Sequence, residues 1–282
     1  MATDRTQSIG ASDAPAVVCG PQFPIWAEKT GIAEPPDLDA VEAVQWGKIL
    51  EATIAATYAD RSGRTVEHNA NADVTRHPDW LWMTATLDAL QTDPKRGIGA
   101  LEVKNVGLYR AKDWEGDTPL KVQIQLQHQL AVTGMPWGTL CALIGGNRMI
   151  WYDMDRNQRF IDAMIEKERD FWALVKSNTP PPPDGSIATA ETLKRLYPLG
   201  TEGEIIALPV DATSWDAKLE AAKQRIKFWE TDKRKLENQF RAAMGTATLG
   251  VLPGGGGYTL NTTNKKAFSV KATSFRTLRR QA

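Results

Sequence analysis

Residues 87–104 read LDALQTDPKRGIGALEVK, and this stretch decides how we interpret the fold. The loose alternation of apolar and polar side chains over residues 81–91 predicts a strand. The segment TDPKRG predicts a turn from its proline and glycine, and residues 98–106 predict the returning strand. If these two strands are neighbours in one sheet, the carboxylates of Asp88 and Glu102 can approach each other.

Charged side chains in this stretch form a candidate metal site. Residues two apart on a strand share a face, so Glu102 and Lys104 point the same way while Val103 points into the core. Asp88 and Glu102 would hold a hard divalent cation, Mg²⁺ first of all, with the backbone carbonyl of Val103 as a further ligand. Such a cation polarises a phosphate and lowers the pKa of bound water, which Lys104 would orient or activate. The alternative is a simple Glu–Lys pair on an exposed sheet face.

Further residues favour the metal site over the simple ion pair. Glu51 lies in a predicted amphipathic helix, residues 41–61, and would supply a third carboxylate. Gln125 and Gln129 share one face of another predicted helix, where their amides would hold a water or a phosphate oxygen. Ser12 precedes a helix expected to start near residue 14. It is therefore either part of an anion site at the helix N-terminus or an ordinary N-cap.

The order of the predicted elements indicates a mixed sheet with helices packed on it. After the first two strands come a helix, a hairpin and a second helix, at residues 120–133, 137–154 and 158–177. Four prolines at residues 180–183 then end the helical pattern, because proline cannot continue a helix. We therefore expect a first domain over residues 1–183 and an accessory region over 184–282.

The accessory region has a heptad pattern and a basic end. Apolar residues alternate at spacings of four and three from Trp215 to Ala243, interrupted at Lys233, and predict a long helix over 213–244. Such a helix would pair with another helix of the same chain or with a partner. A small hairpin is expected over residues 249–262.

Charge is distributed unevenly along the chain. The formal net charge is zero, yet residues 238–282 contain seven basic and no acidic residues, so the remainder carries a net charge of −7. A basic tail on an acidic body indicates a polyanionic or acidic partner for the tail, or a solvated basic surface.

Composition excludes several classes of protein. Hydrophobic residues make up 42% of the chain, enough for a sizeable core. The first residues are too polar for a signal peptide, and no apolar run has the length of a membrane span. Cys19 and Cys141 match no ligand spacing and indicate reduced core thiols. We therefore expect a cytoplasmic protein without a membrane segment.

Six motifs in order carry a family resemblance: IGASD, WGKILE, LDAL, LEVK, QLQHQLAVTG and ALIGG, followed by FW and the prolines. Over residues 5–183 this order resembles the YqaJ family of viral recombinases, which are relatives of the phage lambda exonuclease. It implies the α/β core, of α+β type, of the PD-(D/E)XK nuclease superfamily. That core is a central mixed sheet flanked by helices, here with a smaller C-terminal helical and hairpin extension.

The resemblance also implies roles for the charged residues. Asp88 and Glu102 resemble the metal-binding carboxylates, and Lys104 resembles the active-site lysine. Glu51 resembles the helix glutamate that serves a second metal or positions a water molecule.

Other positions are carried over in the same way. Gln125 matches the glutamine of the family's Q-x-x-x-Y helix, whereas Gln129 stands where related nucleases often have tyrosine. Arg5 and Ser12 have the spacing of the arginine and serine that hold the terminal 5′-phosphate in the lambda enzyme.

The function implied is a Mg²⁺-dependent exonuclease, with Mn²⁺ as an alternative ion, that acts on linear double-stranded DNA. It would digest one strand in the 5′→3′ direction and leave 3′ single-stranded tails for homologous recombination. The resemblance also implies a homo-oligomeric, trimeric ring and a single-strand annealing protein as partners. The alternatives are an endonuclease or single-strand nuclease with the same core, and a non-catalytic DNA-binding recombination scaffold. No dinucleotide or P-loop fingerprint favours a small-molecule enzyme.

Overall fold

The structure is a computed structural model, which describes residues 5–69, 71, 73–267, 269, 272 and 276–280. The chain divides into two compact units, Met1–Pro198 and Leu199–Ala282. The division falls beyond the boundary expected at residue 183, because helix α6 (Ile187–Leu196) packs against α2 (Gln22–Lys29). Whether residues 1–183 form an independent domain stays a prediction.

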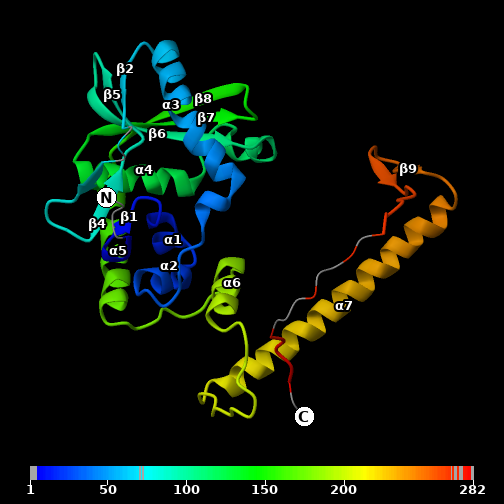
Figure 1. Ribbon diagram of the computed structural model, residues 1–282. Helices are drawn as coiled ribbons and strands as arrows, with labels where there is room; N and C mark the ends of the chain where they lie inside the picture. The colour runs from blue at the N-terminus through cyan, green and yellow to red at the C-terminus, as the bar shows by residue number, and fades with distance from the viewer. Residues whose placement is uncertain are drawn as a thin grey trace. The chain divides into compact units, whose positions relative to one another are not determined.

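A five-stranded mixed sheet forms the centre of the first unit (Figure 1). Its strands, in spatial order, are β2 (Thr65–His68), β5 (Ala89–Asp93), β6 (Gly97–Val106), β7 (Trp137–Ile144) and β8 (Arg148–Asp155). β6 and β7 run parallel, whereas the other neighbouring pairs are antiparallel. A parallel pair needs a long crossover, which η3 (Leu108–Trp114) and α4 (Leu120–Thr133) supply. The predicted mixed sheet with flanking helices is confirmed.

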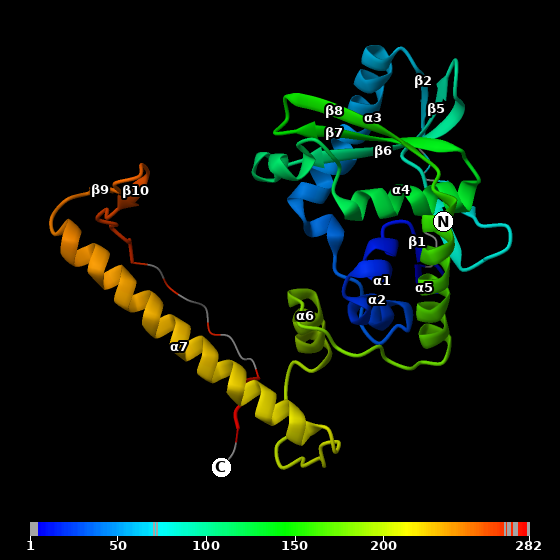
Figure 2. The same ribbon diagram turned by 180° about the vertical axis from the view of Figure 1, so that it is seen from behind.

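Helices α3 (Glu42–Ser62) and α4 cover opposite faces of this sheet (Figures 1 and 2). On the α3 side, Ile54 and Tyr58 pack with Val103 of β6. On the α4 side, Leu126 packs with Ala100 of the same strand. Because successive residues of a strand face opposite ways, Glu102 of β6 points toward α4.

A second, three-stranded sheet has the order β1 (Ile9–Gly10), β4 (Met83–Thr86) and β3 (Val74–Arg76). The prediction of one strand over residues 81–91 is wrong, because β4 and β5 belong to different sheets. The chain bends between them, and Asn69 takes the place of a strand neighbour. Its backbone N–H donates to the carbonyl of Asp88 (2.9 Å) and its side-chain amide to the carbonyl of Leu87 (3.0 Å).

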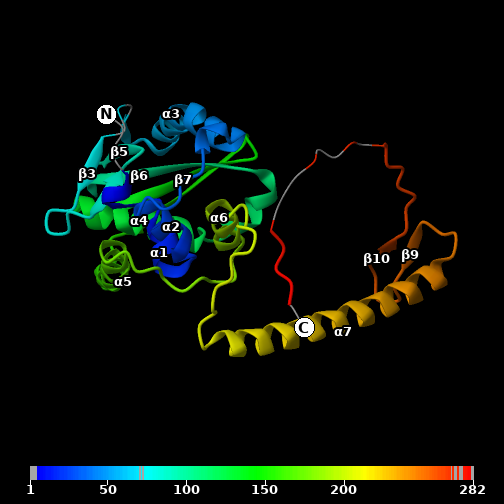
Figure 3. The ribbon, with the colours of Figure 1, turned by 60° about the horizontal axis from the view of Figure 1, so that its bottom comes forward.

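The remaining helices of the first unit are α1 (Ala14–Cys19), α2, α5 (Gln158–Lys176) and α6, grouped on the far side of α4 from the sheet (Figure 3). A core that includes Trp26 and Phe171 joins α2 to α5. The N-cap of α1 is Asp13, so Ser12 is not the cap. Cys19 is exposed, contrary to the prediction, whereas Cys141 is buried.

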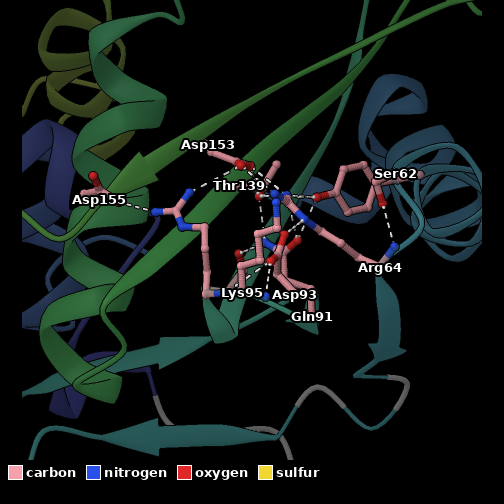
Figure 4. A network of polar contacts seen from close by, with 11 residues as sticks. Ser62, Arg64, Gln91, Asp93, Lys95, Thr139, Asp153 and Asp155 are labelled. Carbon is pink, nitrogen blue, oxygen red and sulfur yellow. Dashed lines mark hydrogen bonds and ion pairs between the residues drawn. The ribbon is translucent and has the colours of Figure 1, made fainter.

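A network of charges lies where β6 begins (Figure 4). Arg64, just after α3, forms ion pairs with Asp153 of β8 (2.6 Å) and Asp93 of β5 (2.8 Å). Arg96 pairs with Asp153 as well (3.3 Å), and both guanidinium groups lie over the ring of Trp137 at 4.7 and 4.3 Å from its centroid. The network therefore ties both edges of the sheet to its centre.

The second unit consists of α7 (Ala212–Met244) and a hairpin of β9 (Leu249–Val251) and β10 (Gly257–Thr259). The long helix and the hairpin are thus present as predicted, with shorter strands. The ring of Tyr258 lies 4.1 Å from that of Phe240, which fixes the hairpin to the end of the helix. Within the described residues, no helix combines the length and the apolar character needed to cross a membrane.

Candidate active site

Glu102 is the centre of the candidate site. It lies in the middle of β6, points toward α4, and is only 1% exposed. A carboxylate buried this deeply must be hydrogen-bonded or paired with a cation, because desolvation of an isolated charge costs several kcal/mol. Both of its oxygens have such partners.

Two glutamines of α4 hold the Glu102 carboxylate in place. The amide of Gln125 donates to Oε1 (2.6 Å), and the amide of Gln129 donates to Oε2 (2.5 Å). The two glutamines lie one helical turn apart and share a face, as predicted. Both amides bind the Glu102 carboxylate, whereas their expected role was to hold a water or a phosphate oxygen. The side-chain carbonyl oxygen of Gln129 is buried and has no hydrogen-bond partner among the residues that the structure describes. Position 129 therefore fixes the orientation of Glu102 and keeps an acceptor available for a further donor.

Lys104 shares the face of Glu102, two residues along β6. Its ammonium group donates to Glu102 Oε1 and to the carbonyl oxygen of Gln125 (3.1 Å). Burial lowers the pKa of Lys104, but the charge of Glu102, its hydrogen bond and the charges of Asp88 and Glu51 outweigh that effect. The pKa is raised above its ordinary value. The neighbouring carboxylates therefore favour the charged, hydrogen-bond-donating form of Lys104.

Asp88 approaches Glu102 from the bend before β5. Its Oδ2 accepts the backbone N–H of Val103 at 2.7 Å. Burial raises its pKa well above the ordinary value, and the negative charges of Glu102 and Glu51 raise it further. Two carboxylates thus converge without enough positive charge to balance them. Because the N–H and C=O of one strand residue face the same neighbour, Val103 also turns its carbonyl toward Asp88.

Glu51 lies near this cluster but is paired elsewhere. Its carboxylate contacts Nε2 of His68 at 3.0 Å, and both side chains are about 30% exposed. Its charge still contributes to the raised pKa of Asp88. The predicted role of Glu51 as a metal ligand stays a prediction.

The donor set fits a hard divalent cation. Within the part of the chain that the structure describes, no group of three His, Cys, Asp or Glu side chains is arranged to hold a metal. Asp88, Glu102 and the carbonyl of Val103 nevertheless offer oxygen donors, the kind of ligand that hard divalent cations prefer.

A cavity of about 310 Å³ adjoins Asp88. Asp88 and Gln125 line one part of it, and Ser12 and Lys29 line another. Lys29 forms a buried ion pair with Asp13 (2.6 Å), which also accepts the N–H of Gly10 (3.0 Å). The structure therefore brings predicted Ser12 to the same cavity as predicted Asp88.

Several residues of this region were not anticipated. Lys29 was not predicted, because nothing in the spacing of Asp13 and Lys29 indicates that they meet. Arg5 opens the short helix η1 (Arg5–Gln7), and its side chain lies outside the described part of the chain. Its predicted phosphate contact stays a prediction.

Comparison with known proteins gives matches for most of the chain. Residues 2–136 match the model of the YqaJ-like viral recombinase domain. The chain is 30% identical over 258 residues to the uncharacterized protein YqaJ of Bacillus subtilis (strain 168). That match covers 88% of this chain and 79% of the relative.

Solved structures with a similar fold include an alkaline exonuclease, LHK-Exo, from Laribacter hongkongensis. The TM-score is 0.52 at 18% identity, over 62% of this chain and 91% of that one. The structure of LHK-Exo in complex with dAMP has a TM-score of 0.51 at 20% identity, over 68% and 93% of the two chains. The likeness at this identity concerns the fold.

Proposed function

Because the chain belongs to the YqaJ-like viral recombinase family, we propose that it is a divalent-metal-dependent exonuclease acting on linear double-stranded DNA. One observation carries the proposal: Asp88 and Glu102 converge beside Lys104 with an excess of negative charge. Such a cluster is unfavourable for stability alone and is typical of a site that takes up a cation. The exonuclease named among the similar folds supports the choice of reaction.

Each residue has a distinct task in the proposed reaction. Asp88, Glu102 and the carbonyl of Val103 would hold Mg²⁺, or Mn²⁺ in its place, and the bound ion would polarise the scissile phosphate and lower the pKa of an attacking water. Lys104, being protonated, donates to this water or to a phosphate oxygen and stabilises the growing negative charge. Gln125 orients both Lys104 and Glu102.

The cavity beside Asp88 supports the polarity that we propose. Ser12 lines it, and its hydroxyl is a suitable donor for a terminal 5′-phosphate. Arg5 would add a bidentate contact. We therefore propose 5′→3′ digestion that leaves 3′ single-stranded tails. The release of nucleoside monophosphates fits the dAMP complex of LHK-Exo.

The wider setting follows from the same proposal. The enzyme would act in recombination as a ring-shaped homo-oligomer, a trimer by family analogy, around the DNA. A single-strand annealing protein would take over the 3′ tail.

Digestion of three matched DNA substrates tests the proposal. They are a linear duplex with 5′-phosphates, the same duplex with 5′-hydroxyls, and a closed circle, each with Mg²⁺ or with chelator. We expect loss of the linear duplexes only, fastest with 5′-phosphates, and no reaction with chelator. Lys104→Ala should be inactive, whereas Lys95→Ala, at an exposed lysine in the β5–β6 turn, should be active. Cutting of the circle would show an endonuclease, and no digestion under any condition would refute the nuclease proposal.

A further inference from the structure

Helix α7 carries an apolar stripe that the second unit leaves exposed except at Phe240, where the ring of Tyr258 packs. We call it the α7 seam, and its members alternate at spacings of four and three: Trp215, Leu219, Ala222, Ile226, Trp229, Lys233, Leu236, Phe240 and Ala243. No residue of α7 is buried, and Trp229 and Ile226 are 64% and 57% exposed. Large exposed apolar patches mark interaction sites, and a helix of this kind gains most of its stability from packing that face.

We propose that the α7 seam binds the α7 seam of a second copy of this chain, with the two helices antiparallel. The two-fold axis passes between residues 227 and 228, so that Ile226 of each copy packs against Trp229 of the other. The order of residues along the seam, its flanking charges and the ion pairs of the second unit each support this arrangement over a parallel one.

The seam is symmetric about this axis. Four kinds of core layer result, each formed twice: Trp215 with Phe240, Leu219 with Leu236, Ala222 with Lys233, and Ile226 with Trp229. The polar interruption at Lys233 thus faces the small side chain of Ala222. In a parallel pair, Lys233 would instead face Lys233 of the second copy, which places two like charges in the core.

Charges flanking the seam favour the same orientation. In the antiparallel pair, Arg225 faces Asp232 of the second copy, and Lys223 faces Glu230, which makes four attractive contacts in the dimer. A parallel pair would keep only the attraction between Arg225 and Glu230. It would also oppose Lys218 with Lys223, and Asp232 with Glu237, in both copies. Flanking charges of this kind set the orientation of coiled coils.

One kind of like-charged contact remains, formed twice in the dimer. Ion pairs within each second unit neutralise it. Asp216 would lie near Glu237 of the second copy. Within each chain, Asp216 is already paired with Arg280 (2.8 Å), and Glu237 is already paired with Arg241 (3.2 Å). The basic end of the chain thereby removes the repulsion that the antiparallel pair would otherwise contain.

Two neighbouring aromatic residues provide a matched test of the surface. Trp229 belongs to the seam, whereas Phe228 is exposed beside it and lies off the seam. In the full chain, we expect Trp229→Glu to halve the mass of the largest assembly in sedimentation, while Phe228→Glu leaves it unchanged. Equal masses for Trp229→Glu and the wild type would overturn the proposal and leave the seam to a different protein.

Charge exchange tests the orientation. Arg225→Glu should weaken self-association roughly tenfold, because two attractions in the dimer become repulsions. Adding Asp232→Arg should restore it, and adding Glu230→Arg instead should not. Rescue by Glu230→Arg alone would show a parallel pair and overturn the arrangement.

A distance measurement gives an independent reading of the register. Each copy carries a spin label at position 218, in a chain whose exposed Cys19 is replaced by serine. In the antiparallel pair, the labels of the two copies are offset by 19 residues along the helix axis. The helical rise converts this offset to roughly 28 Å along the axis. A parallel pair would bring the two labels to about 10 Å, the separation of packed helices, and would refute the proposal.

Discussion

Two clusters of charge lie on the same central strands and have opposite electrostatic character. In the network at the start of β6 (Figure 4), Asp93 and Asp153 each pair with Arg64. Backbone and arginine hydrogen bonds lower the pKa of Asp93. For Asp153, hydrogen bonds from Arg64 and Thr139 overcome the effect of burial and lower its pKa as well.

In the bend before β5, beside the second half of β6, burial and neighbouring carboxylates raise the pKa of Asp88 instead. The same residue type is thus stabilised as an anion at one end of the strand and destabilised at the other. The difference teaches that the first cluster serves the fold. The second cluster, Asp88 with Glu102, lowers the stability of the fold, and a bound cation would remove that loss. The predictions below test this division of roles.

The largest effect should follow from removal of the Lys104 ammonium group, which lies beside Asp88 and Glu102. We expect Lys104→Met to lower the rate of DNA digestion about 10³-fold or more, because a preorganised donor at the phosphate is lost. The rate is compared with that of Lys95→Met at equal protein concentration. A loss of less than tenfold would place Lys104 outside the reaction.

Disruption of the balanced network should reduce stability and spare activity. Arg64 is 12% exposed, and Arg64→Leu takes one ion-pair partner from Asp93 and one from Asp153, which keeps Arg96, so it should cost about 2 kcal/mol of unfolding free energy. Urea denaturation measures this cost, with Arg148→Leu on the exposed surface as the control. A cost below 0.5 kcal/mol, roughly that of a surface substitution, would mean that the network contributes little to the fold.

Magnesium should stabilise the chain only through the cluster of Asp88 and Glu102. At a concentration about 100 times its Kd, a bound ion adds roughly 2.7 kcal/mol, or about 5–10 °C in Tm. We expect this shift in the wild type and in Arg64→Leu, and its loss in Glu102→Gln and with chelator. An equal shift in Glu102→Gln would locate the ion elsewhere.

The smallest effect concerns a third pair, His128 and Glu168, buried between α4 and α5 with 2.9 Å between Nδ1 and Oε1. Burial lowers the pKa of His128, but the charge and hydrogen bond of Glu168 outweigh it, and the pKa is raised. A raised histidine pKa stabilises the fold below the unfolded value of about 6.5, and this contribution is lost as pH rises through the folded pKa.

Thermal unfolding across this pH range checks the sign. The Tm of the wild type should fall with rising pH more steeply than that of His128→Gln. Parallel curves for the two proteins would show that His128 is neutral in the folded state throughout.

Local patterns in the sequence predicted a large part of this picture. Alternation along a strand places Glu102 and Lys104 on one face, and helical spacing places Gln125 and Gln129 on one face; the structure shows both. These relations need only the geometry of a single element. The helix over residues 120–133 was likewise predicted with the same limits that the structure gives, where Gly134 adopts a left-handed conformation at its end.

Other features depend on contacts between distant segments, which single-element patterns do not contain. The break at Asp88 depends on Asn69, which belongs to another part of the chain. The pairing of Asp13 with Lys29 across two helices is of the same kind. The prolines end a helix as expected, yet α6 returns to pack on α2, because apolar residues such as Leu193 continue the core beyond them.

The measurement that tests the central claim most directly is a comparison of stability and activity in one variant, Asp88→Asn. Asparagine keeps the size of the side chain and removes the charge that Glu102 and Glu51 repel. In chelator at neutral pH, we expect this variant to resist urea better than the wild type. When Mg²⁺ is supplied, we expect it to digest no linear duplex. A variant that is less stable than the wild type, or that digests DNA at the wild-type rate, would contradict the account.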